Sequence, residues 1–323
     1  MKEKYARKYL IETGIGLQDV DHLKNSDFFL NETNKYIKGE ISLNELDQRI
    51  NSYYESRPKP EDRSDEADKV SLRISQIISD DSFTFTVGQL ISIHKFLFNG
   101  LLEHPGQIRT YNFSKKEWVL DGKSVTYGDY RDLKTTLQYD FEQERKFDYR
   151  NLSIDEIIDH LSIFVSNLWQ IHVFEEGNTR TVATFFIKYL RSLGFDVTNE
   201  IFAKNAWYFR NSLVRANYRD LSKGIYEDRS FLIRFLRNLL KGENIPLKNR
   251  ELHIVSNTTP VDENSKDFKI LSLIRSNPKI TSNELANELG ISTRTVKSIL
   301  KLLIEKQTIK RVGGKRYGHW ETK

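Results

Sequence analysis

The sequence predicts a mainly α-helical protein with two units: a large helical domain that holds one β-hairpin, and a small basic domain near the C-terminal end. Three observations predict this fold class. Apolar residues recur at helical spacing through most of the chain up to residue 242. Asp121-Gly122, placed between two apolar runs, predicts the hairpin. A polar stretch with two prolines, residues 243–266, then reads as a linker before a second helical pattern.

Composition limits what the protein can be. The chain has 323 residues, of which 38% are apolar and 12% aromatic, so it can bury a core and global disorder is excluded. It has no cysteine, which excludes disulfides and thiolate metal sites and fits a reducing compartment. No run of about 18 apolar residues and no signal-like N-terminal segment occurs. We therefore expect a soluble cytoplasmic protein without a membrane partner.

Positive charge is concentrated at one end. The net charge is only +5, but residues 292–323 hold nine Lys and Arg against two Glu. A localised basic segment of this kind favours a polyanionic partner there.

The elements before residue 150 are expected in this order. Residues 1–60 form an N-terminal helical region, and a larger domain spans 61–242. Its first helix begins near Asp65 and has its apolar residues on one face, and residues 86–102 form another. The hairpin follows at residues 115–128, with Trp118–Leu120 as its first strand.

The best-marked helix covers residues 152–172. Ser153 and Glu156 form a capping box, and apolar residues keep helical spacing behind it. The next helix begins directly after a short loop and ends at Gly194. Residues 205–221 and 228–242 continue the helical pattern.

The loop between those two helices, within "QIHVFEEGNTRTVATFF", carries the candidate chemistry. A glycine at a helix N-terminus, Gly177, marks an anion site, because free backbone N–H groups and the helix dipole both favour phosphate. Arg180 in the first turn can bind a further phosphate oxygen. Glu176 is the candidate Mg²⁺ ligand, with Glu175 as its competitor. His172 is the candidate general base. Together these parts indicate phosphoryl or nucleotidyl transfer.

The same stretch resembles the signature of the Fic family, His-x-Phe-x-[Asp/Glu]-Gly-Asn-x-Arg. Six residues match it: His172, Phe174, Glu176, Gly177, Asn178 and Arg180. The resemblance extends over about residues 60–240. It implies a Fic-type domain that transfers AMP from ATP to a protein hydroxyl.

The resemblance also implies a role for each residue. His172 would deprotonate a Ser, Thr or Tyr acceptor on a protein substrate, which could be the chain itself, and Glu176 would hold Mg²⁺. The amides of Gly177, Asn178 and Thr179 would cradle the phosphates of ATP, and Arg180 would steady them. The hairpin would be a flap that holds the target segment as an added strand.

The sequence departs from the family pattern at three positions: Val173 replaces a proline, Thr179 a glycine, and Ala183 a second arginine. That arginine normally pairs with a self-blocking helix of pattern Ser/Thr-x-x-x-Glu, for which the nearest candidate here is Ser64 to Asp68. Self-inhibition by that route is therefore not expected. A different donor nucleotide also stays open.

Two further functions remain open at this point. One is a DNA-binding transcriptional regulator whose Fic domain is a nucleotide sensor or inactive. The other is a Fic-type phosphohydrolase or de-AMPylase that uses the same base on water. Arg109 could line the cleft or lie on the surface.

Residues 267–323 resemble a winged helix-turn-helix domain. Helical segments surround "NELANELGISTRTVKSILKLLIEK", and a two-strand wing turns at Gly313-Gly314. The second helix of such a motif enters the major groove by its N-terminal residues, and wing cations neutralise phosphates. The candidate DNA contacts are Thr293, Arg294, Thr295, Lys297, Lys315 and Arg316. Dimerisation or docking of a protein is the alternative, and a homodimer stays open.

Overall fold

The computed structural model divides into two units, Met1–Ile254 and Val255–Lys323. It describes residues 2–55, 57–198, 200–254, 266–305, 309–313 and 318–322. Each unit has its own buried apolar core. The prediction of a mainly helical fold is confirmed.

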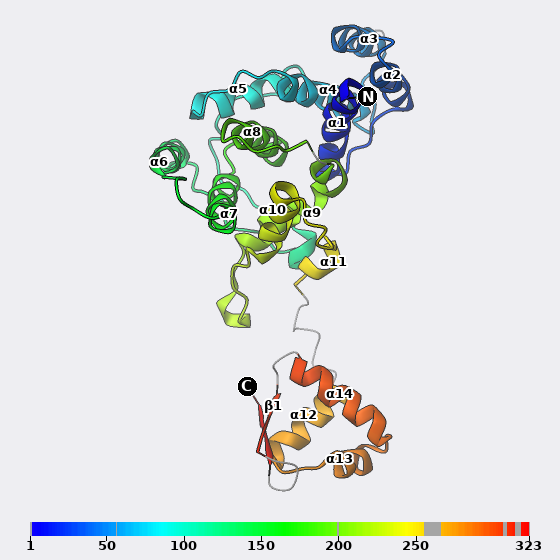
Figure 1. Cartoon of the computed structure of the whole chain (residues 1–323), viewed down its shortest axis with the longest axis vertical. Coiled ribbons are helices and arrows are strands. Elements are labelled where there is room, and N and C mark those ends of the chain that lie inside the picture. The colour runs from blue at the N-terminus through cyan, green and yellow to red at the C-terminus, as the bar shows by residue number, and fades with distance from the viewer. Residues whose placement is uncertain are drawn as a thin grey trace. The chain divides into compact units, whose positions relative to one another are not determined.

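The larger unit consists of helices joined by loops and short 3-10 turns (Figure 1). The α-helices are α1 (Lys2–Gly16), α2 (Asp27–Lys38), α3 (Leu43–Glu55), α4 (Ser64–Ser79), α5 (Val87–Phe98), α6 (Leu133–Lys146), α7 (Ile154–Ile171), α8 (Asn178–Ser192), α9 (Ile201–Ala216), α10 (Ser230–Lys241) and α11 (Asn249–Leu252). The 3-10 turns are η1 (Leu17–Asp21), η2 (Trp118–Leu120) and η3 (Leu221–Lys223).

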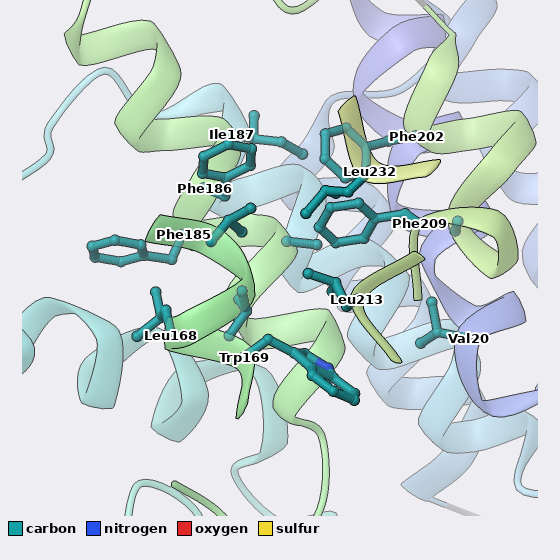
Figure 2. Packing of buried hydrophobic residues seen from close by; sticks show 14 of the residues in the cluster. Val20, Leu168, Trp169, Phe185, Phe186, Ile187, Phe202, Phe209, Leu213 and Leu232 are labelled. Carbon is teal, nitrogen blue, oxygen red and sulfur yellow. The ribbon is translucent and has the colours of Figure 1, made fainter. Parts of the chain in front are cut away.

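Helix α8 is the centre of this unit. Each residue from Asn178 to Leu190 is buried, and α4, α5, α7 and η1 pack around the helix. Figure 2 shows Phe185 and Phe186 of this helix in the same apolar cluster as Trp169 of α7 and Phe209 of α9. The chemistry-bearing loop before α8 is therefore held on a rigid element.

Helix α7 begins as predicted. The Ser153 side chain accepts a hydrogen bond from the Glu156 N–H, and the Glu156 carboxylate accepts one from the Ser153 N–H, so the capping box is confirmed. The helix ends at Ile171, and His172 follows in the left-handed conformation with φ of 52°. This conformation, uncommon for a residue other than glycine, turns the chain sharply into the loop.

The β-hairpin predicted for residues 115–128 was wrong. Asp121 and Gly122 do reverse the chain, both with positive φ, and the Glu117 N–H donates to the Lys123 carbonyl. However, Trp118–Leu120 forms the turn η2 and no strand occurs in this segment. Val119 and Leu120 are both fully buried. Neighbouring residues of a strand face opposite sides, so a two-stranded hairpin with one face in solvent would have exposed one of the two.

In its described residues the smaller unit has three helices and a two-stranded sheet, which confirms the predicted winged helix-turn-helix; Gly314 of the predicted wing turn lies outside the described residues. The helices are α12 (Lys266–Ser276), α13 (Ser282–Leu289) and α14 (Thr293–Glu305). The strands β1 (Ile309–Val312) and β2 (His319–Thr322) are antiparallel, with Arg311 opposite Trp320. The Trp320 indole N–H donates to the Ile280 carbonyl at 3.1 Å, which fastens the sheet to the helices.

Among the residues that the structure describes, no helix has both the length and the apolar character needed to cross a bilayer.

Candidate active site

His172 lies at the end of α7, and aromatic rings surround its side chain. Its side chain is buried, and its ring stacks on Tyr127 with the centroids 3.9 Å apart. Trp169 and Phe113 meet the ring edge-on at 5.2 and 5.6 Å. The ring atom Nδ1 lies 3.3 Å from the Trp169 carbonyl oxygen. Because a carbonyl only accepts, Nδ1 carries the proton and Nε2 holds the free lone pair.

The Nε2 atom of His172 has no hydrogen-bond partner among the described residues although it is buried. Burial lowers the pKa of this imidazole well below its usual value, and the nearby cations Lys115, Arg210 and Arg109 act in the same direction. The ring is therefore neutral at physiological pH. An unpartnered, neutral Nε2 is able to accept a proton from a group that enters the site.

The loop after His172 is fastened from inside. The Asn178 side chain bridges both polar groups of the Phe174 backbone, at 2.9 Å to the N–H and 2.7 Å to the carbonyl oxygen. The Phe174 ring stacks on the imidazole of His94, with centroids 3.7 Å apart. His94 also contacts the Glu176 carbonyl oxygen through Nε2 at 3.0 Å. These contacts fix the backbone between the candidate base and the N-terminus of α8.

Gly177 is required by packing. Its φ is +73°, and a Cβ there would lie 2.4 Å from the ring of Phe98. The space that a side chain would need at this position is filled by an aromatic ring. The Thr181 N–H donates to the Gly177 carbonyl and so begins the helical bonding of α8. The amides before it have no partner within the helix, which is the geometry that binds anions.

The Thr179 side chain faces the protein interior. Its hydroxyl accepts a hydrogen bond from the Trp169 indole N–H at 2.9 Å. Thr179 therefore ties α8 to α7 through its side chain.

Glu176 already has a cationic partner. The guanidinium of Arg63, directly before α4, lies 2.8 Å from Glu176 Oε1 and also bonds the Glu66 carboxylate. The Arg63 and Glu176 side chains are 40% and 38% exposed, so the contact is open to solvent and to competing ions. Sequence reasoning did not identify Arg63, because 113 residues separate it from Glu176.

Arg180 is fully buried and paired with carboxylates within the protein. Its guanidinium lies 2.8 Å from Glu66, 2.9 Å from Asp21 and 3.1 Å from Gln18, and it stacks on Phe98. In this state Arg180 offers no free edge to a phosphate.

The contact with Glu66 also changes the expectation for α4. The candidate Asp68 points elsewhere and bonds Ser26 and Tyr54. Two residues earlier on α4, Glu66 contacts Arg180 instead. The helix thus approaches the motif with a carboxylate that the Ser/Thr-x-x-x-Glu pattern did not reveal.

A polar pocket of about 320 Å³ opens beside the loop. It is lined by His94, Leu102, Glu103, His104, Tyr111, Glu175 and Glu176. Glu176 thus faces a space that can hold a ligand, whereas His172 is not among the lining residues. Within the described residues no group of three His, Asp or Glu side chains is placed to hold a metal alone. Mg²⁺ that arrives with a nucleotide needs only one or two carboxylates, so Glu176 fits that role.

Arg109 is buried and points inward, so it is neither a cleft residue nor a surface residue. Its guanidinium donates to the carbonyl oxygens of His172 at 2.7 Å and Gly128 at 2.5 Å. The sequence gives no sign of this, because the partners are backbone atoms far along the chain.

The described candidate DNA-binding residues lie at the start of α14 in the smaller unit. Arg294 and Lys297 are exposed, while Thr293 and Thr295 are half-buried in the first turn. The Ser292 hydroxyl accepts from the Thr295 N–H at 3.1 Å and caps the helix. Val296 and Leu300 bury the opposite face. Lys315 and Arg316 lie outside the described residues.

Comparison with known proteins gives two matches to family models. Residues 84–190 match the Fic/DOC family, and residues 263–310 match winged helix-turn-helix DNA-binding domains. No curated protein matches the chain. A crystal structure of a Fic family protein from Desulfovibrio desulfuricans G20 is similar at 16% sequence identity, covering 98% of this chain and 87% of that chain, with a TM-score of 0.46.

The motif and the two family-model matches define a helical protein with a Fic-type domain and a winged helix-turn-helix module. The chain carries a Fic/DOC family domain at residues 84–190, and a winged helix-turn-helix domain follows it at the C-terminal end.

Proposed function

We propose that the protein is an adenylyltransferase that transfers AMP from ATP to a Ser, Thr or Tyr hydroxyl of a protein. The observation that carries the proposal is the buried, unpartnered Nε2 of His172, held at the end of α7 immediately before the N-terminus of α8. A neutral base beside an anion-binding helix end is the arrangement that activates an alcohol toward a phosphate ester.

In this reaction Nε2 of His172 takes the proton of the acceptor hydroxyl. The acceptor oxygen then bonds to the α-phosphorus of ATP, the bond from that phosphorus to the bridging oxygen breaks, and pyrophosphate leaves. The proton on the Trp169-bonded Nδ1 stays in place, so the imidazole becomes a cation only transiently. The amides at Gly177, Asn178 and Thr179 stabilise the charge that develops on the α-phosphate.

Glu176 would hold Mg²⁺ after Arg63 leaves it, since both side chains are partly exposed and their contact is weak. When bound, the ion neutralises phosphate charge. Arg180 would steady the phosphates only after it exchanges Glu66 for an anionic ligand.

Intact-mass measurement after incubation with each nucleoside triphosphate and Mg²⁺ tests the proposal. A gain of one AMP on the protein, or on a candidate partner, is expected with ATP. His172→Ala should abolish the gain. A shift with another nucleotide would correct the donor, whereas release of AMP from a modified protein would assign hydrolysis instead of transfer.

We also propose that the smaller unit binds duplex DNA through the N-terminal turn of α14. The exposed Arg294 and Lys297 beside the capping residue Ser292 support this. Thr293 and Thr295 would contact the same groove, and Lys315 and Arg316 would add phosphate contacts. Protein docking by the same face is the alternative.

A second function is favoured by the closed state of the site: a DNA-binding regulator whose Fic domain senses a nucleotide without transferring it. The enclosed imidazole and the ion pairs of Arg180 with Glu66 and Asp21 support this reading. It predicts nucleotide binding with no mass gain on any acceptor. Cells carrying His172→Ala would then keep the regulatory phenotype, and cells carrying Arg294→Ala would lose it.

A further inference from the structure

One buried guanidinium, that of Arg109, gathers the backbone around His172. It donates to the carbonyl oxygens of His172 at 2.7 Å, Gly128 at 2.5 Å, Tyr111 at 2.6 Å and Ile171 at 3.3 Å. It also reaches the Asn112 side chain at 3.2 Å. Its hydrogen-bond partners among the described residues are thus carbonyl and amide oxygens alone. Only a planar fork of five donors can serve so many acceptors from one position.

These acceptors belong to three separate pieces of chain. The pieces are the end of α7, the segment before η2, and the segment that returns from it. Two backbone hydrogen bonds join the same pieces of chain. The Arg109 N–H donates to the Val173 carbonyl at 3.0 Å, and the Gly128 N–H donates to the Gln170 carbonyl at 3.2 Å. The Gln170 side chain donates to the Thr126 carbonyl at 3.1 Å. The left-handed backbone of His172 is therefore held from behind by contacts that do not involve its imidazole.

The imidazole itself is covered by different atoms. Phe113 and Tyr127 contact the ring. Both come from the segment between residues 112 and 128, whose two ends are hydrogen-bonded to Arg109. An acceptor hydroxyl can reach Nε2 only when this cover moves. If these two rings and the backbone at the end of α7 moved together, His172 would be displaced at the moment its imidazole is exposed. The Arg109 hydrogen bonds separate the two, because they stop at the ends of the covering segment. Its guanidinium also lies over the Phe113 ring, 5.2 Å from the centroid, and that contact is lost when the ring moves while the hydrogen bonds stay.

We propose that Arg109 is a positioning residue of the transfer reaction, which keeps the His172 backbone in place while Phe113 and Tyr127 uncover its ring. The inference rests on the function proposed above for His172. A displacement of about 1 Å at a reacting group can cost about 100-fold in rate, so loss of this anchor is expected to act on the chemical step.

The test compares Arg109→Lys with a matched control, Arg191→Lys. Arg191 also donates to a backbone carbonyl, that of Ile78 at 2.6 Å, but it lies at the far end of α8. With the full chain, we expect kcat for AMP transfer to fall about 100-fold in Arg109→Lys, with KM for ATP changed by less than about threefold. The control variant should keep kcat within about threefold.

A second variant keeps the test valid if Arg109→Lys folds poorly. Gln170→Ala removes a half-exposed side chain that joins α7 to the Thr126 carbonyl. We expect a partial loss in kcat of about three- to tenfold. Equal losses in Arg109→Lys and Arg191→Lys would overturn the proposal, because a general effect on stability would then explain both. Wild-type kcat in Arg109→Lys or Gln170→Ala would overturn it as well.

An NMR readout separates this proposal from the proposed function. In wild type, the imidazole of His172, assigned by His172→Ala, should stay neutral with its proton on Nδ1 at physiological pH, because burial lowers its pKa. Charges that face this ring come from Lys115, Arg210 and Arg109. In Arg109→Lys we expect a loosened, more hydrated ring that titrates at least about one pH unit higher. If the wild type transfers nothing but the titration shifts, the proposed function fails and the anchoring role stands; an unshifted titration overturns the role.

Discussion

Arg63 and Glu176 show how two single side chains can set the state of a site. Arg63 occupies the carboxylate at which we expect Mg²⁺, and the contact is more than a third exposed on both sides. Ion pairs with this exposure contribute about 0.2–1 kcal/mol, so a divalent cation can displace the guanidinium.

Arg63→Ala is therefore expected to tighten Mg²⁺-dependent ATP binding by up to about fivefold, because the competing cation is gone. Titration calorimetry with and without Mg²⁺ measures this. The matched control is Arg150→Ala, which removes an exposed arginine paired with Asp148 elsewhere on the unit. A gain that persists in EDTA, or no gain at all, would contradict the assignment of Glu176.

Gly177 allows the cost of backbone conformation to be separated from the cost of packing. Gly177→Ala should lower the free energy of unfolding by about 2–4 kcal/mol, since it adds a strained positive φ and a clash with Phe98. Gly194→Ala serves as the control, because Gly194 also has a positive φ but no atom near its absent Cβ. Denaturant unfolding of both variants should give the smaller loss for Gly194→Ala. Equal losses would show that Phe98 yields.

Single residues also mark the limit of prediction from the sequence. The residues of the motif could be identified because they are contiguous and sit between two well-marked helices. Gln18, Asp21, Arg63 and Glu66 could not, because they meet Arg180 or Glu176 only through tertiary packing. No local pattern distinguishes them from ordinary charged residues on helix surfaces.

At the scale of elements, helices were predicted better than the one irregular segment. Helix α7 carries an apolar stripe and a capping box, two local signals that agree, and it begins where they indicate. The segment around η2 carries an Asp-Gly turn signal, which correctly gave the reversal at residues 121–122. Burial of both Val119 and Leu120 then overrode the strand preference of their side chains.

Helix α14 provides the element-scale prediction for DNA. Arg294→Ala is expected to weaken binding to duplex DNA and to reduce the slope of log K against log salt by about 1, because one phosphate or base contact is lost. Fluorescence anisotropy at several salt concentrations measures both quantities. Lys269→Ala is the control, since Lys269 is exposed on α12, outside the helix-turn-helix pair. An equal effect of both variants would indicate diffuse electrostatic attraction instead of a defined DNA contact.

At the scale of the whole larger unit, stability should depend on pH through His94. Burial lowers the pKa of this imidazole from 6.5 to about 4, with the Arg180 charge adding to the shift. As the pH falls below 6.5, the unfolded chain binds a proton that the folded chain does not, so stability declines until about pH 4.

This difference amounts to about 2 kcal/mol between pH 7 and pH 5. Thermal unfolding at both values should show it, and His94→Gln should reduce the pH dependence by about this amount, although it lowers stability overall and the buried His172 still contributes in the same direction. His104→Gln, at an exposed position, is the control. A His94→Gln variant with the wild-type dependence on pH would refute the assignment.

The ring of partners around Arg180 has a practical consequence for anyone who cuts this protein into pieces. The family match begins at residue 84. The two carboxylates paired with this enclosed cation, Asp21 on η1 and Glu66 on α4, and the Gln18 amide that also contacts it all come before that point. A fragment trimmed to the match would strand a positive charge in an apolar interior, a defect that commonly costs about 3–5 kcal/mol. An insoluble or inactive fragment would then reflect the loss of these partners, and it would not show whether the intact protein is a catalyst.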